Sequence, residues 1–517
     1  MIRRSPRRGF LRGAWLLFLA SVVSLALLFA GLYALSVRHA PATPDAPLLV
    51  YCAAGVKQPI EAAAQEYEKV YGVPVHLEYG GSQTLLAKLE VNPRGDLFIL
   101  ADDHFVALAR KKDLLAEAIP LAHMTPVIAV AKGNPRKIQS VDDLLKGDYT
   151  LSLANPDAAA VGKLTRDALQ ASGQWEALQK RSNQVSKPTV NDVANDVKLG
   201  AAGAGIVWDA TVKQMPDLDA VADPQLAKKK AQMSAGVLKA SAQPTAALRF
   251  ARFLAARDRG QLEVKKAGFE PIDGDKWEVA PEMTLYAGAM LRPAVAETIA
   301  EFEKREGVKV ITKYNGCGIL VGDMRAGVPP DAYFACDTSF MKQVHDLFLE
   351  PIDISSNQLV IVVHKGNPKN LRSLKDLGTP GLQIGVGHEQ QCALGAITQQ
   401  TLAEAGLRDP VNKNIAVRSP AGDLLINQLR AAPTSLDAVI AYISNTAGLS
   451  DIEAYTVEGI PCATVIQPIA VGKDSKHKQL ASRLMDAIRS RESQDRFAAY
   501  GFGWEQEKIK PGAKGSK

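Results

Sequence analysis

The chain has 517 residues, 47% of them hydrophobic and 22% charged, a composition typical of folded globular protein with more than one domain. Its net charge is +6, but five arginines lie within the first twelve residues, so the remainder is close to neutral. This balance, and the lack of a stripe of basic and aromatic residues, exclude nucleic acid as a partner.

The N-terminal segment predicts a membrane anchor. Residues 14–35 form an uncharged apolar run of 22 residues, about 33 Å long as a helix and therefore able to cross a bilayer. Arginines before the run place the N-terminus in the cytoplasm and the body of the chain outside. A cleaved secretory signal, ending near Ser36, is the alternative, and PRRGFLR resembles a twin-arginine export signal.

The rest of the chain is a tandem duplication. LLVYCAAGVKQPIEAAAQEYEKVYGVPVHLEY matches MTLYAGAMLRPAVAETIAEFEKREGVKVITKY, 235 residues further on. VAKGNP at Val130 matches VHKGNP at Val363, and AGIVW, ending at Trp208, matches AVIAY, ending at Tyr442. Matches at a nearly constant offset indicate two homologous modules. The predicted divisions are a basic cytoplasmic N-terminus at 1–13, the anchor or signal segment at 14–36, a proline-containing linker at 37–46, modules at 47–280 and 281–510, and a polar tail at 511–517.

Strands and helices are expected to alternate within each module. In the first module the predicted order is a strand at 48–53, a helix at 60–72, a strand at 73–79, a helix at 84–90, a strand at 95–101 and a helix at 107–115. The first of these helices should end at Gly72. This alternation predicts an α/β fold with open parallel sheets, whose loops at the carboxyl ends of the strands line a ligand crevice.

Three loops of the first module have the chemistry of an anion site. AAGVKQ, GGSQT and NPDAAAVG are rich in small residues, and each precedes a predicted helix. Small side chains allow backbone N–H groups at a helix N-terminus to approach a ligand, which suits a compact oxyanion held by neutral donors. The alternative for Ser82 is that it only caps its helix.

Catalytic motifs are missing from the sequence. It contains no HExxH, GxSxG, P-loop or CxxC pattern, so no catalytic residue, metal site or cofactor is predicted. Two pairs of acids correspond between the modules, Asp96 with Asp331 and Asp102 with Asp337. Because the sequence around them is strand-like, we expect them to cap strand ends rather than to act as catalytic acids.

Each module resembles the periplasmic molybdate-binding proteins of ABC transporters, a branch of the type II solute-binding proteins. The motifs that carry the resemblance are strongest in the first module: AAG after a strand, GVPVHLEYGGSQTLLAKL, GDLFILAD, ALQASGQWEAL and AGIVW. The resemblance implies two tandem type II periplasmic-binding-protein modules, each made of two α/β lobes with a ligand cleft between them. It also implies that the protein binds a solute and is not an enzyme.

The resemblance further implies a ligand site in the first module. Gly55 stands where the family has a serine, so only its backbone N–H remains, and Ser82 keeps the family's second serine. Val161 and Val190 match backbone contacts, and Trp208 replaces the family's tyrosine. The predicted site therefore keeps the family's frame with fewer hydroxyl groups.

In the second module the corresponding positions keep the tyrosine and lose both serines. They are Met290, Cys317, Leu394, Leu424 and Tyr442. Cys392 is expected in a cleft-lining loop near Cys317, where export would allow the two to form a disulfide. A soft-metal site, a free thiolate and a buried structural cysteine are the alternatives. Because sulfur donates hydrogen bonds weakly, the second module is expected to bind a hard oxyanion poorly.

These features predict an extracytoplasmic solute-binding protein, anchored in the cytoplasmic membrane by its N-terminal helix. It would capture an oxyanion such as molybdate or tungstate and deliver it to the permease of an ABC transporter. The alternative is a membrane-anchored ligand sensor or scaffold with a degenerate second clamp.

Overall fold

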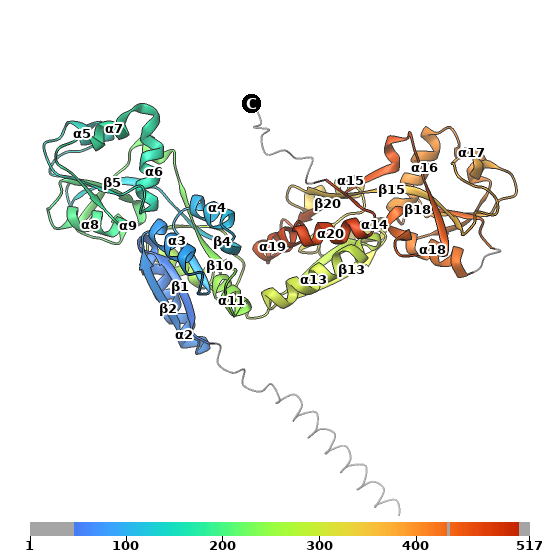
Figure 1. The fold of residues 1–517 in the computed structure, drawn as a ribbon, viewed down its shortest axis with the longest axis horizontal. Coiled ribbons are helices and arrows are strands. Elements are labelled where there is room, and N and C mark those ends of the chain that lie inside the picture. The colour runs from blue at the N-terminus through green and yellow to red at the C-terminus, as the bar shows by residue number, and fades with distance from the viewer. Residues whose placement is uncertain (1–45, 432–434, 506–517) are drawn as a thin grey trace, which may run out of the picture.

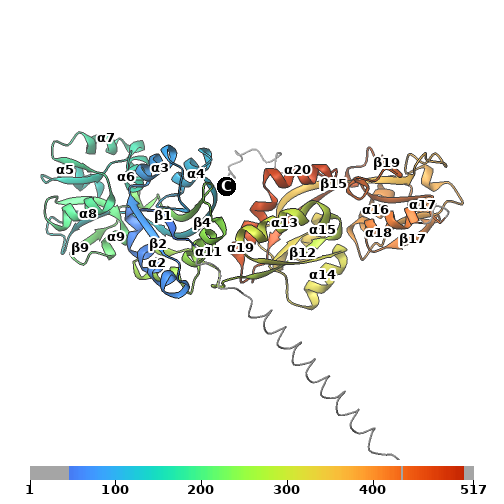
Figure 2. The same ribbon diagram turned by 60° about the horizontal axis from the view of Figure 1, so that its bottom comes forward.

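The computed structural model describes residues 46–431 and 435–505. These residues form two modules of two α/β lobes each, and the four lobes lie in a row with the first lobe of each module in the middle (Figures 1 and 2). The predicted tandem duplication is confirmed. The predicted anchor at 14–36 and tail at 511–517 lie outside the described residues. Within the described residues, no helix is both long enough and apolar enough to span a bilayer.

Lobe one of module one is built on a six-stranded sheet with the order β11-β4-β10-β3-β1-β2. Its strands are β1 (Leu48–Ala53), β2 (Val75–Gly80), β3 (Leu97–Leu100), β4 (Leu115–Met124), β10 (Ala231–Leu238) and β11 (Glu270–Pro271). Its helices are α2 (Lys57–Tyr71), α3 (Ser82–Val91), α4 (Asp103–Lys111), α11 (Pro244–Ala255) and α12 (Gly260–Lys266). The predicted helix end is confirmed, because Gly72 closes α2 in the left-handed conformation with φ of 69°.

Lobe two of module one is built on a five-stranded sheet with the order β7-β6-β8-β5-β9. Its strands are β5 (Pro126–Ala131), β6 (Leu151–Ala154), β7 (Gln184–Lys187), β8 (Ala204–Trp208) and β9 (Leu218–Val221). Its helices are α5 (Val141–Lys146), α6 (Ala160–Leu169), α7 (Gln174–Gln179), α8 (Val190–Lys198), α9 (Asp209–Lys213) and α10 (Pro224–Ala227).

The sheets are mixed, so the prediction of parallel sheets is wrong in part. Strands β1, β2 and β3 are parallel, as are β6, β7 and β8. Strand β10, however, runs antiparallel to both β3 and β4, and β5 runs antiparallel to β8 and β9. The antiparallel strands are those that carry the chain from one lobe to the other, and they enter the sheet without the crossover helix that parallel pairing requires.

Module two repeats this plan with one change of connectivity. Its first lobe contains β12 (Glu282–Gly288), β13 (Lys309–Asn315), β14 (Ala332–Phe334), β20 (Thr464–Val471), β21 (Gly503–Trp504), α13 (Arg292–Glu306), α14 (Cys317–Ala326), α15 (Thr338–Lys342), α19 (Lys478–Ile488) and α20 (Arg491–Ala499). Its second lobe contains β16 (Ile384–Gly387), β17 (Ile415–Ser419), β18 (Ala438–Tyr442), β19 (Ile452–Thr456), α16 (Ala393–Glu404), α17 (Arg408–Asn412) and α18 (Gly422–Ala431). A single strand, β15 (Ile352–His364), passes through both lobes and joins them into one ten-stranded sheet.

The difference between the modules lies at one residue of the crossing strand. In module one β4 ends before Pro126, which pairs with Trp208 at the start of β5. In module two Leu359 pairs with Tyr442 at the same place, and the strand continues. Proline has no backbone N–H to donate to a ladder, so it favours the break.

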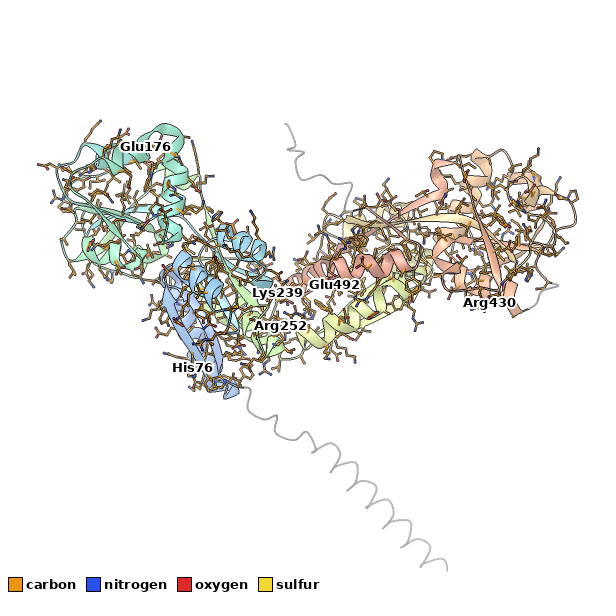
Figure 3. The ribbon with its side chains drawn as sticks, in the orientation of Figure 1. His76, Glu176, Lys239, Arg252, Arg430 and Glu492 are labelled. Carbon is orange, nitrogen blue, oxygen red and sulfur yellow. A yellow bond between two sulfur atoms is a disulfide. The ribbon has the colours of Figure 1, made fainter. Side chains whose placement is uncertain are left out.

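The two modules contact each other through their first lobes. Buried Glu306 of α13 accepts hydrogen bonds from Arg483 of α19 at 2.6 and 3.1 Å, and its backbone carbonyl accepts one from Arg252 of α11 at 3.2 Å. The carboxylate of Asp275 accepts two backbone N–H groups at the start of α19, each at 2.9 Å. Figure 3 shows Arg252 at this junction, with Lys239 and Glu492 nearby. The module-one residues Arg252 and Asp275 thus bind module two directly.

Candidate functional site

The five residues expected at the module-one site line a single small hollow between the lobes. Gly55 and Ser82 come from lobe one, and Val161, Val190 and Trp208 come from lobe two. About 240 Å³ of unfilled space, open solvent included, lies within the hollow, and none of the described residues that line it carries a charge. It can therefore hold only a small ligand, and any anion in it would be held by neutral groups.

Three helix N-termini meet at this hollow. Helix α3 begins at Ser82, α6 at Ala160 and α8 at Val190, and all three residues line the hollow. The first N–H groups of a helix have no partner within the helix, and the helix dipole places partial positive charge at that end. The arrangement is therefore suited to a compact anion.

Ser82 is the one lining side chain with an unsatisfied hydroxyl group. The residue is 2% exposed, and its Oγ has no hydrogen-bond partner. The cap of α3 is Gly81 and not Ser82, and Ser82 makes no capping hydrogen bond, so the helix-cap alternative does not hold. An unpaired buried hydroxyl costs free energy unless a ligand satisfies it.

Gly55 and Trp208 fit together as a pair. A Cβ atom placed on Gly55 would lie 3.2 Å from Nε1 of the Trp208 indole and 2.9 Å from a methyl group of Val190. The indole thus occupies the space that a side chain at position 55 would need. This packing explains why a glycine accompanies the tryptophan.

The lobes of module one are closed onto each other. The backbone N–H of Gln83 in lobe one donates a hydrogen bond of 3.2 Å to the carbonyl of Ala158 in lobe two. A Cβ on Gly81 would lie 2.4 Å from the same carbonyl oxygen and 3.0 Å from that of Pro188. Only glycine allows this approach. Sequence reasoning did not single out Gly81, although its place in the GGS loop before a helix was a usable signal.

Module two has a matching hollow of about 270 Å³. Met290, Cys392, Leu394 and Tyr442 line it, as expected from the sequence, whereas Cys317 is completely buried and does not line it. The hydroxyl of Tyr442 is buried without a hydrogen-bond partner, and burial raises the pKa of its phenol, so it remains a donor.

Leu424 does not line the module-two hollow. It is 45% exposed, and Gly422, the first residue of α18, lies at the hollow instead. The reason is an insertion: Gly422 precedes Ala438 by 16 residues, whereas Val190 precedes Ala204 by 14. A constant offset between the modules therefore selects a residue two positions too late.

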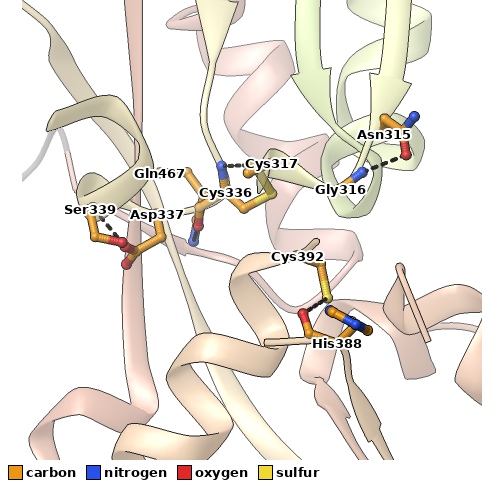
Figure 4. The surroundings of a disulfide bond; sticks show 9 residues. All are labelled: Asn315, Gly316, Cys317, Cys336, Asp337, Ser339, His388, Cys392 and Gln467. Carbon is orange, nitrogen blue, oxygen red and sulfur yellow. Dashed lines mark hydrogen bonds between the residues drawn. A yellow bond between two sulfur atoms is a disulfide. The ribbon is translucent and has the colours of Figure 1, made fainter. Parts of the chain in front are cut away.

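The cysteines pair differently from the expected pairing. Cys317 forms a disulfide with Cys336, whereas Cys392 is free (Figure 4). Cys317 begins α14 and Cys336 follows β14, so both belong to lobe one, whereas Cys392 caps α16 in lobe two. Burial raises the pKa of Cys392, so its thiolate is disfavoured at neutral pH.

The paired acids have structural roles. Asp96 accepts the backbone N–H of Leu49 at 2.9 Å, and Asp331 accepts that of Thr284 at 2.7 Å. Asp102 and Asp337 cap α4 and α15. Among the described residues, no group of three or more histidine, cysteine or acidic side chains is arranged to hold a metal ion.

Comparisons with known proteins find molybdate-binding proteins among the similar ones. The molybdate-binding protein ModA of Mycobacterium tuberculosis is 28% identical over 264 residues, which cover 49% of this chain and 98% of that protein. ModA of Escherichia coli is 26% identical over 145 residues, or 26% of this chain and 56% of that protein. The solved periplasmic molybdate-binding protein of Azotobacter vinelandii is 20% identical and covers 44% of this chain and 100% of its own, with a TM-score of 0.39.

The family described as bacterial extracellular solute-binding protein matches the chain twice, at residues 48–270 and 283–503. Members of such a family bind solutes rather than catalyse reactions, which agrees with the prediction that the chain is not an enzyme. The chain belongs to the bacterial extracellular solute-binding proteins and carries their module in tandem.

Proposed function

We propose that the protein captures a tetrahedral oxyanion, molybdate or tungstate, in module one and delivers it to the permease of an ABC transporter. The observation that carries the proposal is the unpartnered Oγ of Ser82 in a hollow where the N-termini of α3, α6 and α8 meet. The relatives named as molybdate-binding proteins support the choice of ligand, since one of them is matched over 98% of its length.

The uncharged lining of the hollow favours an anion that is bound by hydrogen bonds. No lysine or arginine is among the described lining residues, so binding relies on N–H groups, the Ser82 hydroxyl and the indole N–H of Trp208. Hydrogen bonds to a charged group are about twice as strong as those between neutral groups. Closure of the lobes then removes the anion from water. In the protein interior these dipoles act on the anion more strongly than they would in water.

Closure also gives the signal for delivery. A ligand shifts the balance between open and closed lobes only by the difference in its affinity for the two states. The oxyanion contacts donors of both lobes at once only when the clamp is closed, so it stabilises the closed form that a permease would recognise.

Calorimetric titration of the purified full chain tests the proposal. Molybdate and tungstate should bind with one site per chain, and sulfate and phosphate should bind more weakly. Absence of heat with all four anions, from a chain shown to be folded by circular dichroism, would reject the oxyanion proposal.

Location can be tested separately. We propose that the protein is extracytoplasmic and held to the cytoplasmic membrane through residues 14–35, an uncharged run of 22 residues. The full chain expressed in bacteria should sediment with membranes and stay there in high salt. A mature protein whose N-terminal sequence begins at Val37 would instead support a cleaved signal.

A further inference from the structure

Three positions beneath the hollow differ together between the modules. In module one Ala53, Ser82 and Ala101 line the hollow. The residues 235 positions further on in module two are Gly288, Cys317 and Cys336. Corresponding residues lie at the same places in the two modules. Ala53 ends β1 as Gly288 ends β12, and Ser82 begins α3 as Cys317 begins α14.

The disulfide stands at the base of the module-two hollow, where Cys336 is one of the lining residues. Cys317 and Cys336 are bonded with their Cα atoms 6.4 Å apart, and Cys317 is completely buried (Figure 4). A Cβ on Gly288 would lie 2.2 Å from Sγ of Cys336 and 3.3 Å from Sγ of Cys317. Alanine, which module one has at this position, cannot coexist with the sulfur atoms in this arrangement.

The change also removes hydrogen-bond donors from lobe one. The hydroxyl of Ser82 is replaced by a disulfide sulfur, which has no hydrogen to donate. Sγ of Cys317 instead accepts the backbone N–H of Cys336 at 3.0 Å. The side-chain oxygen of Asn315 accepts the backbone N–H of Gly316 at 2.9 Å, whereas the position of Asn315 in module one is held by Gly80. These N–H groups are satisfied within the protein.

Lobe two of the same module keeps its part of the site. Tyr442 retains an unpartnered buried hydroxyl, and residues at the starts of α16 and α18 line the hollow. The closing contact is also kept, because the N–H of Gly318 donates to the carbonyl of Gln391 at 3.2 Å, as Gln83 does to Ala158. Module two thus differs from module one mainly in the lobe-one half of its site.

We infer that the Cys317–Cys336 disulfide is a specificity-determining element that excludes tetrahedral oxyanions from module two. The inference rests on the proposed function of module one. The disulfide removes the lobe-one hydroxyl, and the N–H groups of Cys336 and Gly316 are bonded within the protein, so an oxyanion in module two would find fewer donors in lobe one than in module one. A tetrahedral dianion has oxygen atoms on every side and needs donors from both lobes.

The test transplants the module-one residues into module two of the full chain. The variant Gly288→Ala, Cys317→Ser, Cys336→Ala reproduces the Ala53, Ser82 and Ala101 set. Calorimetric titration should give one molybdate per chain for the wild type and two for this variant. Cys462→Ser is the matched control, because Cys462 is in the same module, contacts Thr401 and does not line the hollow. This control variant should still bind one molybdate per chain.

The outcomes separate the two proposals. A wild type with one site and a folded variant that also has one site would overturn the inference and leave the proposed function standing. A wild type with two sites would overturn the inference as well. A wild type with no site would reject the proposed function and this inference with it. If the triple variant does not fold, Cys317→Ser with Cys336→Ala, which keeps Gly288, replaces it under the same expectations.

Discussion

The side-chain amide of Asn191, on α8 of lobe two, donates a hydrogen bond of 2.9 Å to the backbone carbonyl of Ala54 in lobe one. Together with the bond from Gln83 to Ala158, it links the lobes of module one across the hollow. The structure therefore represents the closed clamp, and contacts that depend on closure can be tested through ligand affinity.

Closure requires the absence of a side chain at position 81. Gly81→Val places a Cβ only 2.4 Å from the carbonyl oxygen of Ala158 and 3.0 Å from that of Pro188, so the lobes should be held apart. We expect loss of molybdate binding in calorimetry and a larger radius of gyration in X-ray scattering, with or without ligand. The control is Gly322→Ala, whose Cβ would meet nothing within 4 Å. Wild-type affinity in Gly81→Val would contradict the closed-clamp interpretation.

Ser82 should contribute to binding rather than to folding. Ser82→Ala removes a hydroxyl that has no partner in the protein, so affinity for molybdate should fall by about 1–3 kcal/mol, the cost of losing a hydrogen bond to a charged group. The melting temperature should hardly change. Ser172→Ala, at a serine that bonds only its own neighbourhood, is the control. A lower melting temperature with unchanged affinity would show that the serine supports α3 only.

Gly55 and Trp208 should be energetically coupled. Gly55→Ser alone forces a Cβ against the indole and should weaken binding. Gly55→Ser with Trp208→Tyr replaces the indole by a smaller ring and supplies two hydroxyl groups, so it should recover affinity. Residues in contact commonly show coupling of about 0.5–3 kcal/mol in double-mutant cycles. Strictly additive effects of the two substitutions on calorimetric affinity would argue against this packing.

Asp102 should make stability depend on pH. Burial raises its pKa to about 6, above the ordinary value, so the folded state disfavours the charged carboxylate. The folded protein then holds a proton that the unfolded chain releases, and stability is lost as pH rises from about 4 to about 6. Asp102→Asn keeps a capping side chain and removes this loss.

The expected gain from Asp102→Asn is largest at neutral pH. A pKa difference of about two units corresponds to about 3 kcal/mol above pH 6 and to nothing below pH 4. Urea unfolding between pH 4 and pH 8 measures it. An Asp102→Asn curve that runs parallel to that of the wild type over this range would show that Asp102 does not titrate differently in the folded state.

The junction between the modules should depend on Glu306. Glu306→Gln leaves Arg483 and Arg252 buried without their carboxylate, and removal of one partner of a buried ion pair typically costs about 3–5 kcal/mol. We expect a lower melting temperature and a split of thermal unfolding into two transitions in calorimetry. Glu297→Gln, at a carboxylate that is 68% exposed, should change neither. A single unshifted transition in Glu306→Gln would mean that the junction contributes little.

Sequence reasoning grouped the residues that line the module-one hollow because the repeat and the small-residue loops both mark helix starts. Gly55, Ser82 and Val190 each stand at or beside such a start, and the helices carry them to one hollow. The prediction that Leu424 lines the module-two hollow is wrong because the modules were aligned at a constant offset. Such an alignment does not register the extra residues between the start of α18 and β18.

The partner of Cys317 was beyond sequence reasoning for a different reason. Cys336 is 19 residues away and Cys392 lies in the other lobe, and only the packing of α14 against β14 decides between them. The ion pair of Glu306 with Arg483 inside module two is similar, because the residues are 177 positions apart and no periodic pattern connects them. Contacts between elements that are remote in the chain depend on tertiary packing.

The disulfide beneath the module-two hollow also has an evolutionary consequence. Suppose that the two copies began alike, with alanine at both position 53 and position 288. The glycine at position 288 then had to arise before the sulfur atoms could bond, because an alanine Cβ there would lie 2.2 Å from Sγ of Cys336. A return would have to run in the opposite order, since Gly288→Ala is disfavoured as long as the bond exists. The space beside position 288 therefore sets the order in which these three substitutions can occur, and a return to the module-one residues begins with the loss of a cysteine.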